Sequence, residues 1–436
     1  MSAPTPLRRA TMMLALVVAA EAVFALPFVI ARVFRPTLLD VFQITNLQLG
    51  TAFSMYGVVA MLSYFPGGPL ADRFSARRMM TAALLTTSAG GILFASVPPL
   101  GTLKALFAFW GLTTVLLFWA SLIRATREWG GDDSQGKAYG ILDGGRGLLA
   151  ALLATVTVWI FSLLLPVDAA QATIEEREYA LKAIIWIFTG LTFAGGVLVW
   201  FNIPDEEPAK AGEPEAAPGG AFDAAKILTV LRMPMVWLQG LIVICAYVGF
   251  KGTDDLALFA RDAFGFDDVQ AASVSTVSFW VRPLAAFGAG LLGDKIGSPQ
   301  VILLAFATLV IGDSVIAAGL LDTSLPWVLY TAVVGISVAV YGLRGVYFAL
   351  FNAAGVPMAL TGTAVGLVSV IGYTPDVFMG PLMGFLTDRS PGALGHQHLF
   401  GVLALFAAVG FVATAAFMVL SRRAAARLDA AEDPGF

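Results

Sequence analysis

The sequence predicts an all-α membrane protein with twelve transmembrane helices in two pseudo-symmetric six-helix bundles. Three observations lead to this fold class. The 436-residue chain is 58% hydrophobic and only 13% charged, which is about half the charged share of a soluble domain. Its apolar runs repeatedly reach the roughly 20 residues that a membrane helix needs. A short charged turn also recurs in the second half of the chain, as expected of two homologous halves.

The recurring turn defines the halves. Residues 68–73 read Gly-Pro-Leu-Ala-Asp-Arg, and residues 290–295 read Gly-Leu-Leu-Gly-Asp-Lys, 222 positions later. This offset is about half the chain and predicts bundles at 1–202 and 227–436. The segment 203–226 is rich in Pro, Ala, Gly and Glu, a composition that buries little apolar surface. We therefore expect it to be a cytoplasmic linker.

The apolar runs set the expected spans, with boundaries uncertain by a few residues. In order, the twelve spans are 11–31, 47–66, 79–97, 102–122, 138–165, 179–201, 227–249, 269–292, 301–321, 327–351, 360–386 and 399–420. An even number of spans places both termini on one side. With the N-terminus cytoplasmic, 15 Lys and Arg lie inside and 8 outside, so the positive-inside rule favours cytoplasmic termini.

The first charged turn, with Arg77 and Arg78 behind it, resembles the loop between helices 2 and 3 of the major facilitator superfamily. The second copy resembles the loop between helices 8 and 9 of that family. The resemblance implies a secondary transporter of the bacterial inner membrane, working by alternating access with its substrate held between the halves. It also implies that the turn residues act as gates, namely Gly68, Asp72, Arg73 and Arg77 in the first copy and Asp294 in the second.

Three arginines fall within predicted spans, where charge is costly and normally serves a partner or a wet cavity. Arg282 lies near the middle of its span with no acid on the same turn. We expect it to bind an anionic substrate, because a guanidinium holds a carboxylate, sulfonate or phosphate bidentately; pairing with an acid on another helix is the alternative. Arg146 is the second candidate, although Asp143 could pair with it one turn away. Arg344 lies near a span end and is expected to be a gate or an interfacial anchor.

Two acids within spans are candidate proton carriers. Glu21 lies near the middle of the first span, and Asp376 follows Pro375 in the eleventh. A carboxyl group in a low-dielectric setting holds its proton more readily, which suits proton coupling. The alternative is that both acids only balance the arginines.

Aromatic side chains could line the substrate cavity, because a phenol or indole offers a polar group beside an apolar face. The candidates are Tyr56, Trp280, Tyr341 and Tyr373; ordinary packing is the alternative for each. Lys251, Asp254 and Asp255 end the seventh span on the outer side. They are either an outer gate or solvated loop charges, and the sequence favours the second.

The expected function is secondary transport of a small organic anion, coupled to H⁺ or to exchange. Arg282 resembles the helix 8 arginine of oxalate/formate-type antiporters, but helix 11 has Asp376 where those antiporters carry a lysine. The anion branches that include organophosphate antiporters are therefore the nearest resemblance. The rival is a proton-coupled exporter of apolar or cationic compounds, although no arginine lies early in helix 4, where such exporters carry one.

Other classes of function fit the residues less well. Both histidines lie outside the spans and Cys245 is the sole cysteine, so we expect neither an intramembrane enzyme nor a metal site. A non-transporting sensor would not need the charged turn. We expect a monomer in the lipid bilayer that binds a small anionic molecule, with no cofactor and no nucleic-acid partner.

Overall fold

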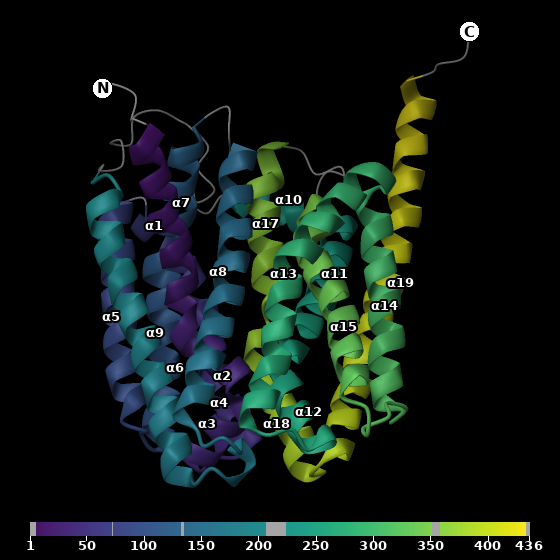
Figure 1. Cartoon of the computed structure of the whole chain (residues 1–436). Coiled ribbons are helices and arrows are strands. Elements are labelled where there is room, and N and C mark those ends of the chain that lie inside the picture. The colour runs from purple at the N-terminus through teal and green to yellow at the C-terminus, as the bar shows by residue number, and fades with distance from the viewer. Residues whose placement is uncertain (1–5, 72, 132–134, 206–223, 351–357, 433–436) are drawn as a thin grey trace. The chain divides into compact units, whose positions relative to one another are not determined.

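The computed structural model describes residues 6–71, 73–131, 135–205, 224–350 and 358–432, and within these ranges every regular element is a helix (Figure 1). In chain order the first part holds α1 (Pro6–Phe24), η1 (Ala25–Val29), α2 (Ile30–Val33), α3 (Arg35–Phe42), α4 (Asn46–Ala71), α5 (Ala76–Ala95), α6 (Leu100–Gly111), η2 (Leu112–Trp119), α7 (Ala120–Gly130), α8 (Gln135–Leu164), η3 (Ala169–Gln171) and α9 (Ile174–Asn202). The second part holds α10 (Ala224–Leu231), α11 (Pro234–Gly252), η4 (Thr253–Asp255), α12 (Leu256–Phe264), α13 (Asp268–Ile296), α14 (Ser298–Ala317), α15 (Pro326–Val346), η5 (Tyr347–Ala349), α17 (Met358–Gly372), α18 (Pro375–Arg389) and α19 (Ala393–Glu432).

Each of the twelve predicted spans coincides with helix along most of its described residues. In this part of the chain, nine helical segments are long and apolar enough to cross a membrane. The remaining three predicted spans coincide with α5, with α13, and with α17 and α18 together. The helices α17 and α18 are 15 residues long each, because the helix is interrupted before Pro375. The ring of a proline disfavours helical geometry in the residue that precedes it.

Two spans contain π-helical stretches. Residues 25–29 join α1 to α2, and residues 112–119 join α6 to α7. Pro27 lies within the first stretch, and a proline removes one backbone donor, which favours such a local widening of the helix. The widened turns let one long span change the direction of its side chains partway along.

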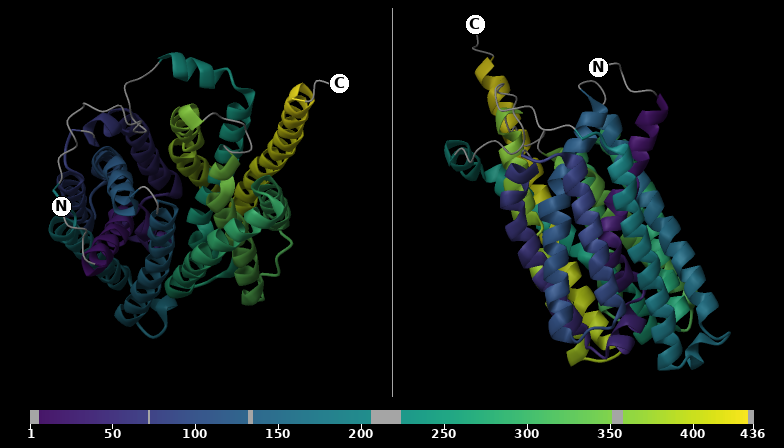
Figure 2. Two further views of the ribbon diagram at one scale, coloured as in Figure 1. Left: turned by 90° about the horizontal axis from the view of Figure 1, so that it is seen from above. Right: turned by 90° about the vertical axis from the view of Figure 1, so that its left-hand side faces the viewer.

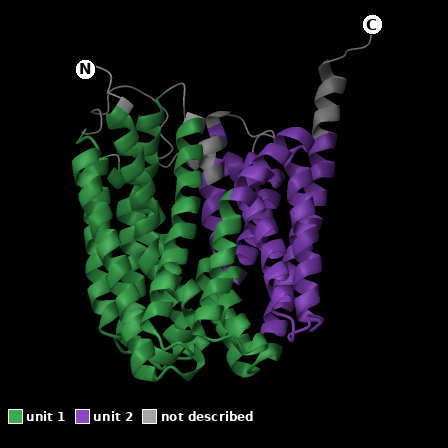
Figure 3. Ribbon diagram, viewed as in Figure 1, with its two compact units in different colours: residues 1–215, 253–283, 376–395 green, residues 216–252, 284–375, 396–436 purple. Residues whose placement is uncertain are grey.

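The chain forms two compact units (Figure 3). Unit 1 contains residues 1–215, 253–283 and 376–395, and unit 2 contains residues 216–252, 284–375 and 396–436. The second half of the chain therefore contributes two segments to the unit built by the first half. The division crosses α13 after Pro283 and falls between Pro375 and Asp376.

Unit 1 packs most of its helices around an aromatic centre. Trp110 is fully buried, and its ring meets Phe94 and Phe107 edge to face at 5.4 and 5.3 Å between centroids. The indole also donates a hydrogen bond to the carbonyl of Thr87. Seen end-on in Figure 2, the helices of the first 200 residues, coloured purple to teal, gather in one group.

Glycines let α4 and α18 approach closely within unit 1. A Cβ on Gly50 would overlap the backbone of Gly380, and a Cβ on Gly384 would overlap the backbone at Leu47. Small residues at such crossings bring helix backbones into contact. The side chain of Asp388 then accepts hydrogen bonds from the backbone N–H groups of Asn46 and Leu47, at the start of α4.

Candidate functional site

Three of the predicted residues within spans meet in unit 1. Glu21 lies on α1, Arg146 on α8 and Arg282 on α13. Oε2 of Glu21 is 3.6 Å from Nε of Arg146 and 3.9 Å from a terminal nitrogen of Arg282. The Glu21 side chain is 5% exposed, that of Arg146 12% and that of Arg282 23%. We call these three residues the central charge cluster.

The contacts in the central charge cluster are ion-pair contacts rather than hydrogen bonds, because both distances exceed 3.5 Å. Among the described residues, Oε2 of Glu21 has no hydrogen-bond partner. Asp143 also lies 3.6 Å from Arg146, but its side chain is 75% exposed, so water screens this pair. The buried part of the cluster therefore carries two positive charges and one negative charge.

Aromatic rings adjoin the central charge cluster. Phe24 lies 5.9 Å from the Arg146 guanidinium, and the ring series continues through Phe28 to Tyr56. Tyr56 is 3% exposed, and its hydroxyl shares a hydrogen bond with Thr114 at 2.7 Å. Trp280 is 40% exposed, and its indole donates to Thr155 on α8. The phenol and the indole thus each have a protein partner.

Unit 2 brings together Arg344 and two of the predicted binding residues, Tyr341 and Tyr373. The guanidinium of Arg344 lies 3.9 Å from the ring centre of Phe250 and 5.6 Å from that of Tyr247. Tyr373 contacts Tyr247, and Tyr341 contacts Phe250, both in edge-to-face geometry. Such rings attract a cation through their negative faces. Arg344 therefore lies in an aromatic box to which two predicted binding tyrosines belong.

Asp376 begins α18 in unit 1, beside α4. A Cβ on Gly57 would overlap the Asp376 backbone, so the acid is held at a close helix crossing. Of the two predicted proton carriers, Glu21 is the one that we include in the central charge cluster.

A second charged group in unit 1 joins Asp254, which the sequence analysis named, to Arg32 and Arg35, which it did not. Arg32 binds Asp254 through Nε at 2.6 Å, and their side chains are 9% and 3% exposed. Arg35 is fully buried; it donates to Asn46 at 2.9 Å and to the carbonyl of Asp254. Burial lowers the pKa of Arg35, against the opposing effect of Asp255 and Asp254. Lys251 and Asp255 are also buried, so the expectation of solvated loop charges at this end of α11 is wrong.

The same end of unit 1 carries a chain of ion pairs. Asp40 accepts from both Arg177 and Arg261 at 3.0 Å. Arg177 also lies 3.2 Å from Asp268, which accepts from the Thr37 hydroxyl at 2.7 Å. Burial raises the pKa of Asp268, and Thr37 and Arg177 oppose that rise. These contacts and the Arg32–Asp254 pair, which we call the outer network, join the first half of the chain to residues 253–283.

The described gate residues of the first charged turn lie at the opposite end of the unit 1 helices. Asp72 lies outside the described residues, and Arg73 is exposed. Arg77 and Arg78 both donate to one oxygen of Asp205, at 2.7 and 2.9 Å. The Ser75 hydroxyl and the two guanidinium groups lower the pKa of Asp205.

The backbone of the first turn is held by an arginine from α7. Arg124 donates to the carbonyls of Ala71 and Phe74, which flank the turn. Gly68 is partly buried beside it. In the second copy of the turn, Asp294 is exposed and a Cβ on Gly290 would meet open space.

No group of His, Cys, Asp and Glu suited to a metal ion occurs within the described part of the chain. Cys245 is buried in α11. The functional groups in and beside the central charge cluster and the aromatic box are guanidinium, carboxylate, phenol and indole groups.

Comparisons with known proteins identify relatives along almost the whole chain. The family model described as Major Facilitator Superfamily matches residues 11–373. The Escherichia coli (strain K12) inner membrane proteins YqcE and YihN are 28% and 26% identical to the chain, covering 87% and 86% of it and 87% of each relative. Neither name states a cargo.

Solved structures share the fold at low identity. A bacterial homologue of the human lysosomal transporter Spinster, inward-facing and unoccupied, has a TM-score of 0.71 at 16% identity, covering 95% of this chain and 98% of that one. The nucleoside transporter NupG, in a mutant form, has a TM-score of 0.68 at 14% identity, covering 94% of this chain and 99% of that one.

Proposed function

Because the chain belongs to the major facilitator superfamily, we propose that it carries a small organic anion across the bacterial inner membrane by alternating access. Membership of this family makes the chain a membrane transporter and not an enzyme. The observation that carries the anion proposal is the central charge cluster, where two guanidinium groups face one buried carboxylate. The cargo class is a carboxylate, sulfonate or phosphate ester.

Arg282 and Arg146 are the proposed anion ligands. An entering anion is attracted to the cluster, because its two guanidinium groups outnumber its one carboxylate. The separations of 3.6 and 3.9 Å from Glu21 exceed hydrogen-bonding distance, so neither guanidinium group is hydrogen-bonded to that carboxylate. Arg282 is the more exposed of the two and would meet the cargo first.

Glu21 is the proposed coupling residue. A proton on Glu21 would raise the net charge of the cluster from +1 to +2, and so would favour anion binding. By linkage, a bound anion would favour protonation of Glu21 to the same degree. This reciprocity supports H⁺-coupled movement of an anion. Asp376 is the second coupling candidate, although it stands outside the central charge cluster.

The outer network is the proposed gate on the side opposite the charged turn. It joins segments from both halves of the sequence through the ion pairs Arg32–Asp254, Arg177–Asp268 and Arg261–Asp40, of which the first is buried, and these contacts have to break when that side opens. Gly68, Asp72, Arg73, Arg77 and Asp294 are the proposed gate residues of the cytoplasmic side, with both termini cytoplasmic and a monomer as the working unit.

In unit 2 we assign Arg344 to a gate as well. The aromatic box supports this role, because stacked rings fix a guanidinium without neutralising it. Tyr341 and Tyr373 are proposed to contact the cargo, as are Tyr56 and Trp280 in unit 1. The hydrogen bonds from Tyr56 and Trp280 to threonines would orient those two rings.

Counterflow in proteoliposomes tests the proposed function. Vesicles holding the purified protein are loaded with one unlabelled solute, and entry of the same labelled solute is followed. The panel contains a dicarboxylate, a sulfonate, a sugar phosphate, a nucleoside and an organic cation of similar size. The proposal expects counterflow for at least one anion, and counterflow of only the nucleoside or the cation would contradict it.

A further inference from the structure

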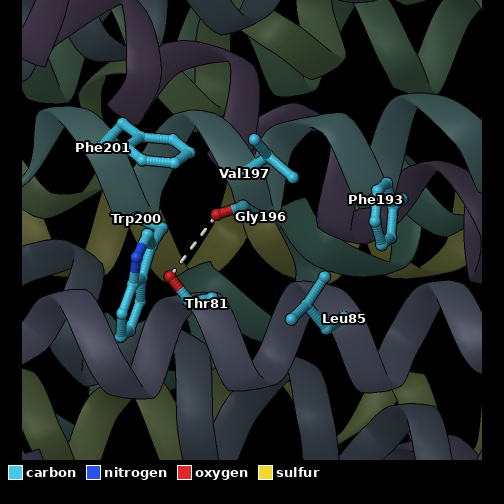
Figure 4. Close-up of a pocket in the computed structure, with 7 residues that line it drawn as sticks. All are labelled: Thr81, Leu85, Phe193, Gly196, Val197, Trp200 and Phe201. Atoms are coloured by element: carbon cyan, nitrogen blue, oxygen red, sulfur yellow. Dashed lines mark hydrogen bonds between the residues drawn. The ribbon is translucent and has the colours of Figure 1, made fainter.

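An apolar groove runs between α5 and α9 on the surface of unit 1, with a volume of about 330 Å³. The residues that line it are Thr81, Leu85, Phe193, Gly196, Val197, Trp200 and Phe201. Figure 4 shows Trp200 and Phe201 at one end and Phe193 at the other. We call this the α5–α9 groove.

The α5–α9 groove exists because a glycine leaves its floor bare. Gly196 has no side chain, and its carbonyl accepts a hydrogen bond from the Thr81 hydroxyl (Figure 4). In this bond the hydroxyl of Thr81 and the carbonyl of Gly196, which lie at the floor of the groove, are paired with each other. The walls are apolar and open to the surroundings, since Phe193 is 54% and Phe201 79% exposed. On a span of a membrane protein, such surfaces face lipid chains.

One end of the groove adjoins a positively charged group. The guanidinium of Arg77 lies 4.6 Å from the ring centre of Trp200, a groove residue. Arg77 and Arg78 share the single carboxylate of Asp205, so this group has a net charge of +1. The Arg78 side chain is 55% exposed. The group lies at the start of α5 and just beyond the end of α9, next to the ends of the predicted spans 79–97 and 179–201.

We propose that the α5–α9 groove binds one acyl chain of an anionic phospholipid, whose phosphate is held by Arg78 and Arg77. An apolar channel that ends at exposed guanidinium groups matches a lipid with a negative headgroup, and basic pockets between helices commonly bind such headgroups. Trp200 at the boundary is typical of the membrane interface. The site is independent of the central charge cluster and of the proposed cargo.

Native mass spectrometry of the full chain in mild detergent tests this site. The protein is mixed with phosphatidylglycerol or with phosphatidylcholine of equal chain length, and the retained lipid is counted. The proposal expects preferential retention of phosphatidylglycerol. Arg78→Gln should weaken it about fivefold, as expected for one basic residue at an anionic lipid surface. Val197→Trp should reduce it further by filling the groove.

Two matched variants control for general effects. Leu198 is 37% exposed against 38% for its neighbour Val197 but does not line the groove, so Leu198→Trp should retain lipid like the unmodified protein. Arg127, exposed at the end of α7, gives Arg127→Gln as the charge control. Thermal melting confirms that each variant is folded. Should Val197→Trp fail to fold, Arg78→Gln still decides the outcome.

Three results would overturn the proposal. The first is equal retention of phosphatidylglycerol by Arg78→Gln and Arg127→Gln. The second is equal retention of the anionic and the zwitterionic lipid. The third is displacement of the lipid by glycerol 3-phosphate, which has the headgroup chemistry without acyl chains; that result would point to a free-anion site.

Discussion

Glu21 and Arg146 lie within unit 1 on different helices, and Oε2 of the acid is 3.6 Å from Nε of the arginine. The same arginine lies 3.6 Å from Asp143, through a terminal nitrogen. The two acids differ in burial, with side-chain exposures of 5% and 75%. Water screens the exposed Asp143–Arg146 pair and weakens it. Glu21 should therefore have a larger electrostatic effect on Arg146 than Asp143 has.

Glu21→Gln and Asp143→Asn form a matched test of this difference. Removing the buried charge should tighten anion binding, since the cluster then carries +2, and should abolish the acceleration of uptake by an inward pH gradient. Counterflow, which needs no proton, should persist. Asp143→Asn should leave both activities nearly unchanged. If the two variants behaved alike in proteoliposome uptake with and without a pH gradient, Glu21 would not be the coupling residue.

Loss of the Arg32–Asp254 pair should destabilise the outer network. Asp254→Asn leaves a buried guanidinium with less compensation, which typically costs about 3–5 kcal/mol. We expect a lower thermal midpoint and faster amide hydrogen exchange in α12. Glu178→Gln is the control, because Glu178 pairs with Lys182 at 2.5 Å but on an exposed surface, where such a pair contributes about 0.5 kcal/mol or less. Equal shifts in the two variants would remove the outer pair from any gating role.

The outer network should respond to pH through Asp268. Thr37, Arg177, Asp40 and Arg261 surround this acid, and burial raises its pKa. The packed state therefore binds the proton more tightly than an opened, solvated state does. The proton stabilises packing below the raised pKa, and this contribution is lost as pH rises from the ordinary Asp pKa through the raised one.

Hydrogen exchange in α3 and α12 measures this effect. After correction for intrinsic exchange, opening should increase with pH in the unmodified protein. In Asp268→Asn it should remain constant, because no carboxyl group is left to ionise at that position. A pH dependence that survives in Asp268→Asn would show that another group controls the network.

The α4–α18 crossing should not tolerate a side chain. In Gly50→Ala the new methyl group meets the backbone of Gly380, so the helices have to separate; such overpacking costs about 1–3 kcal/mol or more. Gly101→Ala is the control, since a Cβ there meets nothing within 4 Å. Folded yield and thermal midpoint should fall only for Gly50→Ala. A similar yield and midpoint for both variants would contradict the close crossing.

The twelve spans could be predicted because length and hydropathy determine them directly. Arg282, Arg146 and Glu21 could each be singled out because a charge within an apolar run is costly. Their meeting could not be predicted, since it depends on how three separate helices are rotated. The family could be recognised from the charged turn. The names of the relatives YqcE and YihN do not state a cargo.

The pairing and burial of the outer network could not be predicted for a different reason. Arg32, Arg35 and Asp254 lie at the ends of spans, where a charge normally reaches water. Arg35 begins the short helix α3, and α12 follows directly after Asp255; neither short helix belongs to a predicted span. Arg32 and Asp254 are also 222 residues apart in sequence, and nothing in a single sequence shows which charges at span ends will pair.

The most direct test of the central claim is counterflow of one labelled organic anion by the unmodified protein, Arg282→Lys and Arg282→Ala in the same proteoliposomes. We predict rapid exchange by the unmodified protein and slower exchange by Arg282→Lys, which keeps the charge but loses the planar fork. Exchange by Arg282→Ala should be at least about tenfold slower, as expected for the loss of a charged hydrogen bond. Equal exchange by all three proteins, at matched amounts of folded protein, would contradict the central claim.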